Sequence, residues 1–320
     1  MSSSGHDSQA RDSPGPLGLR HAGTVRPVST DHRLLGIALA LTSAAAFGVM
    51  PVLTKVVYED GADPVGVLAV RFAIAAVVLQ VLARVRREAR PRGRTLALLA
   101  GLGGVGYVGQ ALFYFFALER ISAGLTSLLL YFYPALVVVL GAVLLRDRPR
   151  PLALGCVAVA TVGTALTVGP VGSGQSTGVL LGLSAALVYA VYILVSSRLQ
   201  GVGPLTTAAW VLTASAVVTG VLAALTTPRL PSTTSAWLAL VGIALIGTVV
   251  AVTTFFAALA LLGPSDTAVL STVEPVVSIA VAALVLGERL RPLQLAGGVV
   301  VLLAVGVLAR TRPARKSVPV

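Results

Sequence analysis

Long apolar stretches recur along almost the whole chain, separated by short polar connections. Ten such stretches lie at residues 34–57, 64–86, 95–118, 122–145, 151–169, 177–199, 204–226, 235–260, 264–286 and 292–310. Each is close to the ~20 residues that an α-helix needs to cross ~30 Å of hydrocarbon. They lack the alternating polar positions of barrel strands, and a backbone in lipid must satisfy its hydrogen bonds within a helix or a closed barrel. The pattern therefore predicts an all-α membrane protein with ten transmembrane helices.

The composition agrees with lipid as the main solvent of the chain. Of its 320 residues, 56% are hydrophobic and 11% are charged, more apolar than a water-soluble protein of this length can bury. The net charge of +12 comes from short basic clusters between the apolar stretches, not from a folded basic domain, which argues against a nucleic-acid partner. Residues 1–30 are rich in Ser, Gly, Pro, Arg and Asp and lack a signal-peptide core, so we expect a disordered cytoplasmic tail there.

The positions of the basic residues predict the orientation. With the N-terminus in the cytoplasm, eighteen of the 24 Lys and Arg residues fall inside, and four fall outside. The inner set is Arg11, Arg20, Arg26, Arg33, the six arginines from Arg84 to Arg94, Arg146, Arg148, Arg150, Arg198, Arg310, Arg312, Arg315 and Lys316, and the outer set is Arg120, Arg229, Arg289 and Arg291. This asymmetry predicts that both termini, including the tail 311–320, lie in the cytoplasm. We expect a multi-pass protein of the plasma membrane.

The second half of the chain repeats the first at an offset of 141 residues. The repeat pairs Phe115 with Phe256, Thr126 with Thr267, Pro134 with Pro275, Asp147 with Glu288 and Pro151 with Pro292. We therefore expect two domains, residues 34–169 and 177–310, of five helices each. Because five is odd, the second copy enters the membrane from the opposite side, so the two are inverted repeats, an architecture typical of secondary transporters.

These motifs resemble those of EamA-domain proteins in the drug/metabolite transporter superfamily. The likeness rests on Leu270–Val276, on Ala282–Glu288, on Gln294 with Gly297 and Gly298, and on Ala45–Lys55 in the first stretch. The chain departs from the family at Asp147, which follows Arg146 where Gly-Glu is usual, and at Phe47, where Trp is common. The resemblance implies a ten-helix exporter or exchanger of small metabolites such as amino acids, amines or drugs. We expect no cofactor, and the absence of a D-x-x-x-D motif and of an intramembrane His argues against an enzyme.

Glu274 is the strongest candidate for a functional side chain. It lies eleven positions into the ninth stretch, about 16 Å along a helix axis, which places it near the middle of the membrane. A carboxylate there costs at least ~2.5 kcal/mol against lipid, so it must face a cavity, a partner or a proton. Glu274 either exchanges a proton for substrate or binds the amino group of a zwitterion, unless it serves as a structural cap or a permanent ion-pair partner.

Two basic residues also lie within the apolar stretches. Arg71 is about seven residues from the outer end of the second stretch, where it could bind an anionic substrate group, balance Glu274, or anchor the topology. Lys55 is close to the outer end of the first stretch and could reach the interface.

Prolines and polar aromatic residues complete the candidate site. Pro51, Pro134 and Pro275 are expected to act as hinges, with Tyr133 and Glu274 as repeat equivalents just before two of them. Further candidates for the cavity wall come from other stretches: Phe47, Gln110, Tyr189, Tyr192 and Trp210.

Other motifs carry less weight. The glycines of Gly101–Gly106 fit a dinucleotide fingerprint but lie within an apolar stretch without a preceding strand, so we expect them to permit close helix packing. Cys156 is the sole cysteine and no histidine lies in an apolar stretch, which argues against a metal site. An intramembrane enzyme, a lipid flippase and a carrier of sugar phosphates or nucleotide sugars stay open as alternatives, as does the oligomeric state.

Overall fold

The computed structural model describes residues 30–144, 151–168, 175–196, 199 and 202–311. All regular elements in this part of the chain are helices, and it contains no strand. The all-α prediction is therefore confirmed for the described residues. The predicted tail at 1–30 falls, except for Thr30, outside the described residues, as do Asp147 and its neighbours in 145–150.

The helices follow the predicted stretches closely. The first half contains α1 (Thr30–Glu59), α2 (Pro64–Val85), α3 (Gly93–Gly101), the π-helix η1 (Leu102–Tyr107), α4 (Val108–Leu118), α5 (Ala123–Leu130), α6 (Tyr133–Leu144) and α7 (Pro151–Val168). The second half contains α8 (Ser176–Ser196), α9 (Pro204–Thr226), α10 (Thr234–Ala244), the π-helix η2 (Leu245–Val250), α11 (Ala251–Ser271), α12 (Val273–Val285) and α13 (Pro292–Thr311).

Seven helical stretches of the described chain are long and apolar enough to cross a membrane. They are His32–Glu59, Pro64–Val85, Gly93–Leu118, Ala123–Val143, Ser176–Ser196, Pro204–Thr226 and Thr234–Leu259. Three shorter apolar helices, Leu154–Leu166, Val273–Val285 and Pro292–Val307, fall within the predicted stretches 151–169, 264–286 and 292–310. The fold is that of a multi-pass helical membrane protein.

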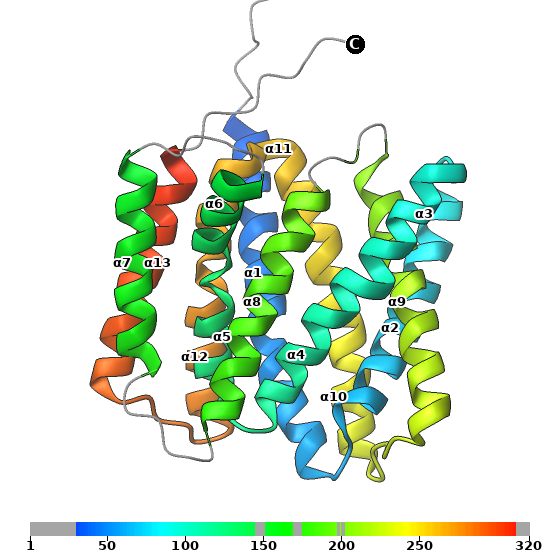
Figure 1. Cartoon of the computed structure of the whole chain (residues 1–320). Coiled ribbons are helices and arrows are strands. Elements are labelled where there is room, and N and C mark those ends of the chain that lie inside the picture. The colour runs from blue at the N-terminus through cyan, green and yellow to red at the C-terminus, as the bar shows by residue number, and fades with distance from the viewer. Residues whose placement is uncertain (1–29, 145–150, 169–174, 197–198, 200–201, 312–320) are drawn as a thin grey trace, which may run out of the picture.

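One predicted boundary is wrong. We expected the eighth stretch to end at residue 260 and the ninth to begin at residue 264, but α11 continues as a helix from Ala251 to Ser271. Figure 1 shows α11 curving across the upper end of the bundle. The chain breaks instead at Thr272, just before the first turn of α12. Pro264 marked a loop in the sequence, but prolines are tolerated in membrane helices where other groups satisfy the freed backbone.

The two halves are interrupted at corresponding places. The break between α5 and α6 falls at Tyr131 and Phe132, and the break at Thr272 lies 141 residues after Tyr131. The π-helices η1 and η2 occupy equivalent positions in the third helical stretch of each half, within two residues of the same offset. Pro134 and Pro275 lie in the first turns of α6 and α12, where a missing backbone donor costs little.

Helix packing has a two-fold pattern. α2 packs on its repeat equivalent α9, and α7 packs on its equivalent α13. Similarly, α1 contacts α11 and α12, as α8 contacts α4, α5 and α6. Figure 1 shows that α1 begins and α13 ends at the same end of the bundle.

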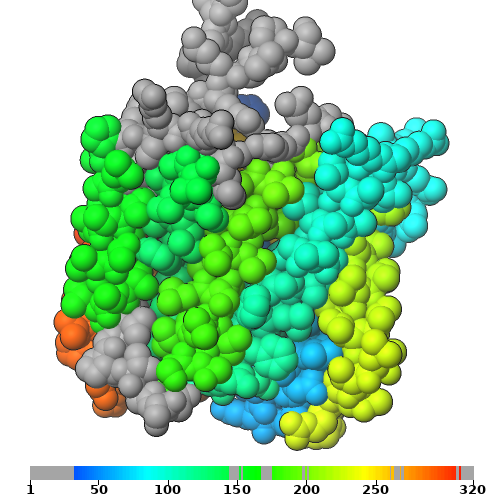
Figure 2. All heavy atoms as spheres, in the orientation of Figure 1, coloured from blue at the N-terminus to red at the C-terminus, as the bar shows by residue number. Residues whose placement is uncertain are grey.

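The outer surface of the bundle is apolar. Exposed side chains include Leu180 and Leu187 of α8, Val105 of η1 and Val162 of α7. Figure 2 shows this face, on which α7, α8 and α4 present a continuous surface of side chains. Large apolar side chains that remain exposed over many helices are expected of a protein whose solvent is lipid.

Candidate functional site

Glu274 lies at the start of a helix, not in the middle of one. It is in the first turn of α12, two residues after the break at Thr272, and its side chain is partly buried. A carboxyl group in this position faces the positive end of the helix dipole. Gly48 of α1 packs against the main chain of Glu274. A Cβ added at Gly48 would lie 2.7 Å from the carbonyl oxygen of Glu274. Helix α1 therefore approaches the break closely.

Glu274 has a polar partner in Tyr131, from the corresponding break in the first half. The Tyr131 hydroxyl lies 2.9 Å from Oε2 of Glu274 and also contacts the main-chain carbonyl oxygen of Ser271. Tyr131 itself is 4% exposed. A phenol has one proton to donate, so it satisfies one of these two acceptors at a time. In both contacts the Tyr131 hydroxyl is the donor and the oxygen of Ser271 or Glu274 is the acceptor.

Five tyrosines form a continuous row of ring contacts that starts at this pair. The rings of Tyr131 and Tyr133 are 6.1 Å apart, those of Tyr133 and Tyr189 are 4.7 Å apart, and Tyr189 stacks on Tyr192 at 6.0 Å. Tyr107 of η1 lies 6.0 Å from Tyr192. We call Tyr131, Tyr133, Tyr189, Tyr192 and Tyr107 the tyrosine row. It joins the α5–α6 break to η1 by way of α8.

Arg71 of α2 lies at the other end of the tyrosine row. Its side chain is 2% exposed, its Nε donates to the Thr248 hydroxyl at 2.8 Å, and its Nη2 donates to the Tyr107 hydroxyl at 3.4 Å. The guanidinium also stacks near the rings of Phe72 and Phe115, at 5.1 and 5.3 Å from their centroids. Thr248 belongs to η2, so this arginine ties α2 to the π-helix of the other half.

Tyr114 of α4 connects the surroundings of the two charges. Its buried hydroxyl is 3.2 Å from the hydroxyl of Ser127, and its ring lies 6.0 Å from that of Phe115, over which the Arg71 guanidinium lies. Ser127 in turn lies 2.9 Å from Ser278, one helical turn after Glu274 on α12. The acid and the arginine therefore border the same polar region in the interior of the bundle.

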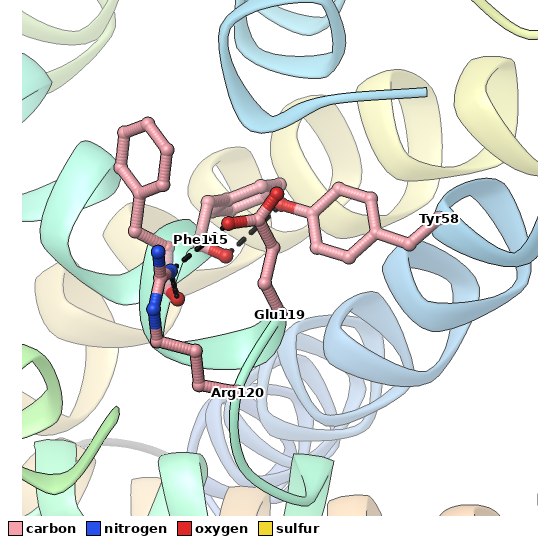
Figure 3. Close-up of polar contacts among 5 residues, drawn as sticks. Tyr58, Phe115, Glu119 and Arg120 are labelled. Carbon is pink, nitrogen blue, oxygen red and sulfur yellow. Dashed lines mark hydrogen bonds and ion pairs between the residues drawn. The ribbon is translucent and has the colours of Figure 1, made fainter. Parts of the chain in front are cut away.

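The wall beside Arg71 is fixed by a contact between α1 and α4. Tyr58 donates to the main-chain carbonyl oxygen of Phe115 at 3.0 Å, as Figure 3 shows, while the Phe115 ring faces Arg71. Nearby, Glu119 pairs with Arg120 at 3.0 Å on the surface. That pair is the one salt bridge among the described residues, so neither Arg71 nor Glu274 has an ion-pair partner there. The static pair between them, one alternative from the sequence, is not formed.

The structure brings together some of the predicted site residues and separates others. Glu274, Tyr133, Tyr189 and Arg71 lie along the tyrosine row, and Trp210 of α9 packs against the same apolar cluster as Tyr107 and Tyr192. Gln110 is buried on α4, and Phe47 is partly buried on α1. Pro51 lies inside α1, which continues through it unbroken.

Lys55 lies apart from this group. It is partly buried on α1, and the charges that act on it are those of Glu288, Glu59 and Glu119. Glu288 lies just after α12 and accepts hydrogen bonds from the main-chain N–H groups of Ala123 and Gly124, at 3.0 and 3.4 Å. Lys55 therefore belongs to a charged cluster near the start of α5, not to the tyrosine row.

Sequence reasoning missed three residues of the site. Tyr131, Tyr107 and Thr248 make the polar contacts of Glu274 and Arg71, yet none was singled out. One signal was available, because all seven tyrosines of the chain lie within the apolar stretches or at their ends. Which of them face each other depends on helix packing, which the sequence does not show.

The packing role predicted for the glycine-rich segment is confirmed at two positions. A Cβ on Gly103 would lie 2.2 Å from the main-chain oxygen of Val211 in α9, and one on Gly104 would lie 2.9 Å from Val218. The Gly103 oxygen also accepts a hydrogen bond from Ser215 at 3.0 Å. At Gly101, an added Cβ would meet nothing within 4 Å.

Comparison with known proteins agrees with this fold. The model of the EamA-like transporter family matches residues 34–169 and again 176–310. No curated protein matches the chain. Among solved structures, one described only as the crystal structure of a protein matches with a TM-score of 0.61 and 22% sequence identity, over 86% of this chain and 97% of the other. This likeness concerns the fold alone.

The two matched segments together span most of the chain, and the motifs that resemble EamA-domain proteins lie within them. Members of this family are membrane transporters, which agrees with the apolar spans of the described helices. The chain therefore belongs to the EamA-like transporter family, within the drug/metabolite transporter superfamily.

Proposed function

We propose that this protein is a secondary transporter of the plasma membrane that exports a small metabolite in exchange for protons. It crosses the membrane ten times as two inverted five-helix halves, with both termini in the cytoplasm. The two halves rock against each other about a central site near the middle of the membrane, between Glu274 and Arg71. Glu274 carries the exchanged proton.

The observation that carries the proposal is the contact of Glu274 with Tyr131 at two broken helices. Transporters with inverted repeats form their central sites from discontinuous helices, whose ends supply polar groups at membrane depth. Here the breaks of both halves meet, and Glu274 and Tyr131 are the side chains that join them. An intramembrane acid is a functional candidate by default, and this one has no basic partner among the described residues.

The hydrogen bonds of Tyr131 support a proton on Glu274 in this conformation. The Tyr131 hydroxyl faces two oxygens, the Ser271 carbonyl and Glu274 Oε2, and has a single proton. If Glu274 is neutral, its own proton can bond the Tyr131 oxygen while the Tyr131 proton bonds the Ser271 carbonyl oxygen. If Glu274 is ionised, the single Tyr131 proton can serve only one of the two oxygens. Opening of the site to water on one side would then favour release of the proton, because hydration stabilises the carboxylate.

The repeated breaks and prolines support rocking of the halves. Pro134 and Pro275 lie in the first turns of α6 and α12, just after the breaks, so the short helices can change angle without loss of a backbone hydrogen bond. Pro51 of α1 provides a third point at which a backbone donor is missing. The contacts α2–α9 and α7–α13 join equivalent helices and are the surfaces on which such a motion would turn.

Efflux from proteoliposomes tests the proposal. Vesicles are loaded with labelled amino acids, amines and cationic drugs, and initial rates are measured with and without an imposed pH gradient for the wild type and Glu274→Gln. We expect at least one compound to leave faster under the gradient in the wild type and to lose this acceleration in the variant. Transport of none of the compounds by the wild type would contradict the proposal. A gradient effect of equal size in the variant would remove Glu274 as the proton carrier.

A further inference from the structure

Arg71 is a buried cation for which the described residues supply no anion. Its hydrogen-bond partners there are two neutral hydroxyls, those of Thr248 and Tyr107, and its other neighbours are the rings of Phe72 and Phe115. Nε and Nη2 are occupied, whereas Nη1 makes no hydrogen bond with any described residue.

This arrangement is costly without a ligand. Removal of a guanidinium from water carries a penalty of several kcal/mol, which a carboxylate partner normally offsets. Neutral hydroxyls and aromatic faces recover only part of that penalty. Yet the chain holds Arg71 firmly, because Thr248 is fixed by its own bond to the carbonyl oxygen of Ile243, and Tyr58 fixes Phe115. An arginine held in place with one N–H edge unpaired is suited to bind an anion.

We propose that Arg71 binds the carboxylate of the transported substrate, which is an organic monocarboxylate with an apolar or aromatic body. This inference rests on the proposed function, since it names a chemical group of the exported metabolite. The carboxylate accepts from Nη1 and from the free N–H of Nη2, next to the Tyr107 hydroxyl. The body of the substrate lies against the tyrosine row, in the direction of Glu274.

The surroundings favour a carboxylate over a phosphate ester. Arg71 is the one cation within this polar region of the described chain, and Lys55 lies in the separate cluster with Glu288 and Glu119. A phosphate dianion would need at least a second cation once it left water. Aromatic rings also follow one another in contact from Phe72 and Tyr107, beside Arg71, through Tyr192 to Tyr189, and these suit an apolar body better than a sugar.

Binding of matched compounds to the purified full-length protein in detergent tests this inference. The probes are pairs that differ only by the carboxylate: phenylalanine and phenethylamine, tyrosine and tyramine, tryptophan and tryptamine, and leucine and isoamylamine. Half-saturating concentrations are taken from thermal stabilisation curves for the wild type, Arg71→Gln and Arg71→Lys. Arg120→Gln, which removes an exposed arginine outside the site, is the control.

We expect the carboxylated member of at least one pair to bind the wild type about 10-fold more tightly than its amine, or better. In Arg71→Gln, its half-saturating concentration should rise ~10- to 100-fold, as loss of a charge-assisted bond implies, while that of the amine changes less than about threefold. Arg71→Lys keeps the charge without the planar fork, so it should show an intermediate loss of the same preference. This variant gives the answer if Arg71→Gln does not accumulate.

Three results would overturn the inference: a wild type that binds no carboxylated compound, a wild type without preference within any pair, or an Arg71 variant that weakens both members equally. The last is what a purely structural arginine would give. These outcomes differ from failure of the proposed function, which is absence of transport in proteoliposomes. If the protein exports the amines with a gradient effect but shows no preference for the carboxylated compounds, the proposed function stands and the inference about Arg71 is wrong.

Discussion

The hydroxyl of Tyr131 lies 2.9 Å from Glu274 Oε2 and links the helix break of one half to that of the other. Tyr131→Phe removes this hydroxyl and keeps the ring beside Tyr133. A hydrogen bond to a charged or proton-sharing group contributes about 1.5–3 kcal/mol, so we expect gradient-driven efflux to fall ~10-fold or more. Initial efflux rates from proteoliposomes measure the change.

Tyr192→Phe is the matched control, since Tyr192 lies in the same tyrosine row and its hydroxyl makes no hydrogen bond with the described residues. Its efflux rate should stay within about twofold of the wild type. Equal losses in the two variants would mean that the row matters for its packing and that the Tyr131–Glu274 bond has no special part.

Gly103→Ala should destabilise the fold. The new Cβ would lie 2.2 Å from the Val211 main-chain oxygen, so η1 and α9 must separate, at a cost of about 1–3 kcal/mol. Unfolding can be followed with a thiol-reactive dye, because Cys156 is the sole cysteine and is 7% exposed. Gly101→Ala, where the new Cβ meets nothing, should be neutral or stabilising by up to ~1 kcal/mol. Similar midpoints for both variants would refute the close-packing role of Gly103.

Glu288→Ala should also lower the midpoint of thermal unfolding. Glu288 accepts from the first two N–H groups of α5, Ala123 and Gly124, and thereby joins the second half to the first. Ser122 is the N-cap of α5, and Glu288 is a second acceptor for N–H groups of its first turn, so we expect a loss of ~0.5–2 kcal/mol, similar to that of a lost capping side chain. Arg289→Ala, at the adjacent exposed position, is the control and should change the midpoint little. An unchanged midpoint in Glu288→Ala would show that water replaces the cap.

Asp60 gives a prediction about pH. Hydrogen bonds from the main-chain N–H groups of Ser232 and Thr233 lower the pKa of Asp60 below its ordinary value of 3.8. A carboxylate with a depressed pKa stabilises the fold above the unfolded value and loses that contribution as pH falls through the folded value. Asp60→Asn should therefore lose stability at neutral pH but flatten the decline of the unfolding midpoint below about pH 4.

Circular dichroism in detergent between pH 3 and pH 7 checks this expectation. Glu59→Gln changes a neighbouring carboxylate that makes no hydrogen bond with the described residues. Its midpoint should follow the wild type across the range. If Asp60→Asn shows the same acid decline as the wild type, the bonds of Asp60 to Ser232 and Thr233 do not contribute measurably to folding.

Hydropathy predicted most of the helix bounds because lipid imposes one length and one composition on every crossing. It failed at residues 260–264, where Pro264 suggested a loop and α11 continues to Ser271. Apolar content alone cannot tell a loop from a bend at the membrane surface. The repeat singled out Pro134 and Pro275 as hinges within the stretches 122–145 and 264–286, but it did not predict that each stretch is interrupted just before its proline.

The sequence could predict only those site residues that carry a charge within an apolar stretch. Glu274 and Arg71 stand out because a charge in lipid needs a reason. Tyr131 and Thr248 do not stand out, because a tyrosine or threonine is unremarkable in a membrane helix, and their importance lies in contacts that span 143 and 177 residues. Such contacts follow from the packing of the two halves.

The most direct test of the central claim is proton movement driven by substrate. Proteoliposomes with a trapped pH dye are given an outward gradient of a transported compound, with no initial pH difference, and the internal pH is followed for the wild type and Glu274→Gln. We predict that export acidifies the wild-type vesicles, while the variant exchanges labelled for unlabelled compound without a pH change. An equal pH change in both proteins would contradict the assignment of Glu274 as the residue that couples export to protons.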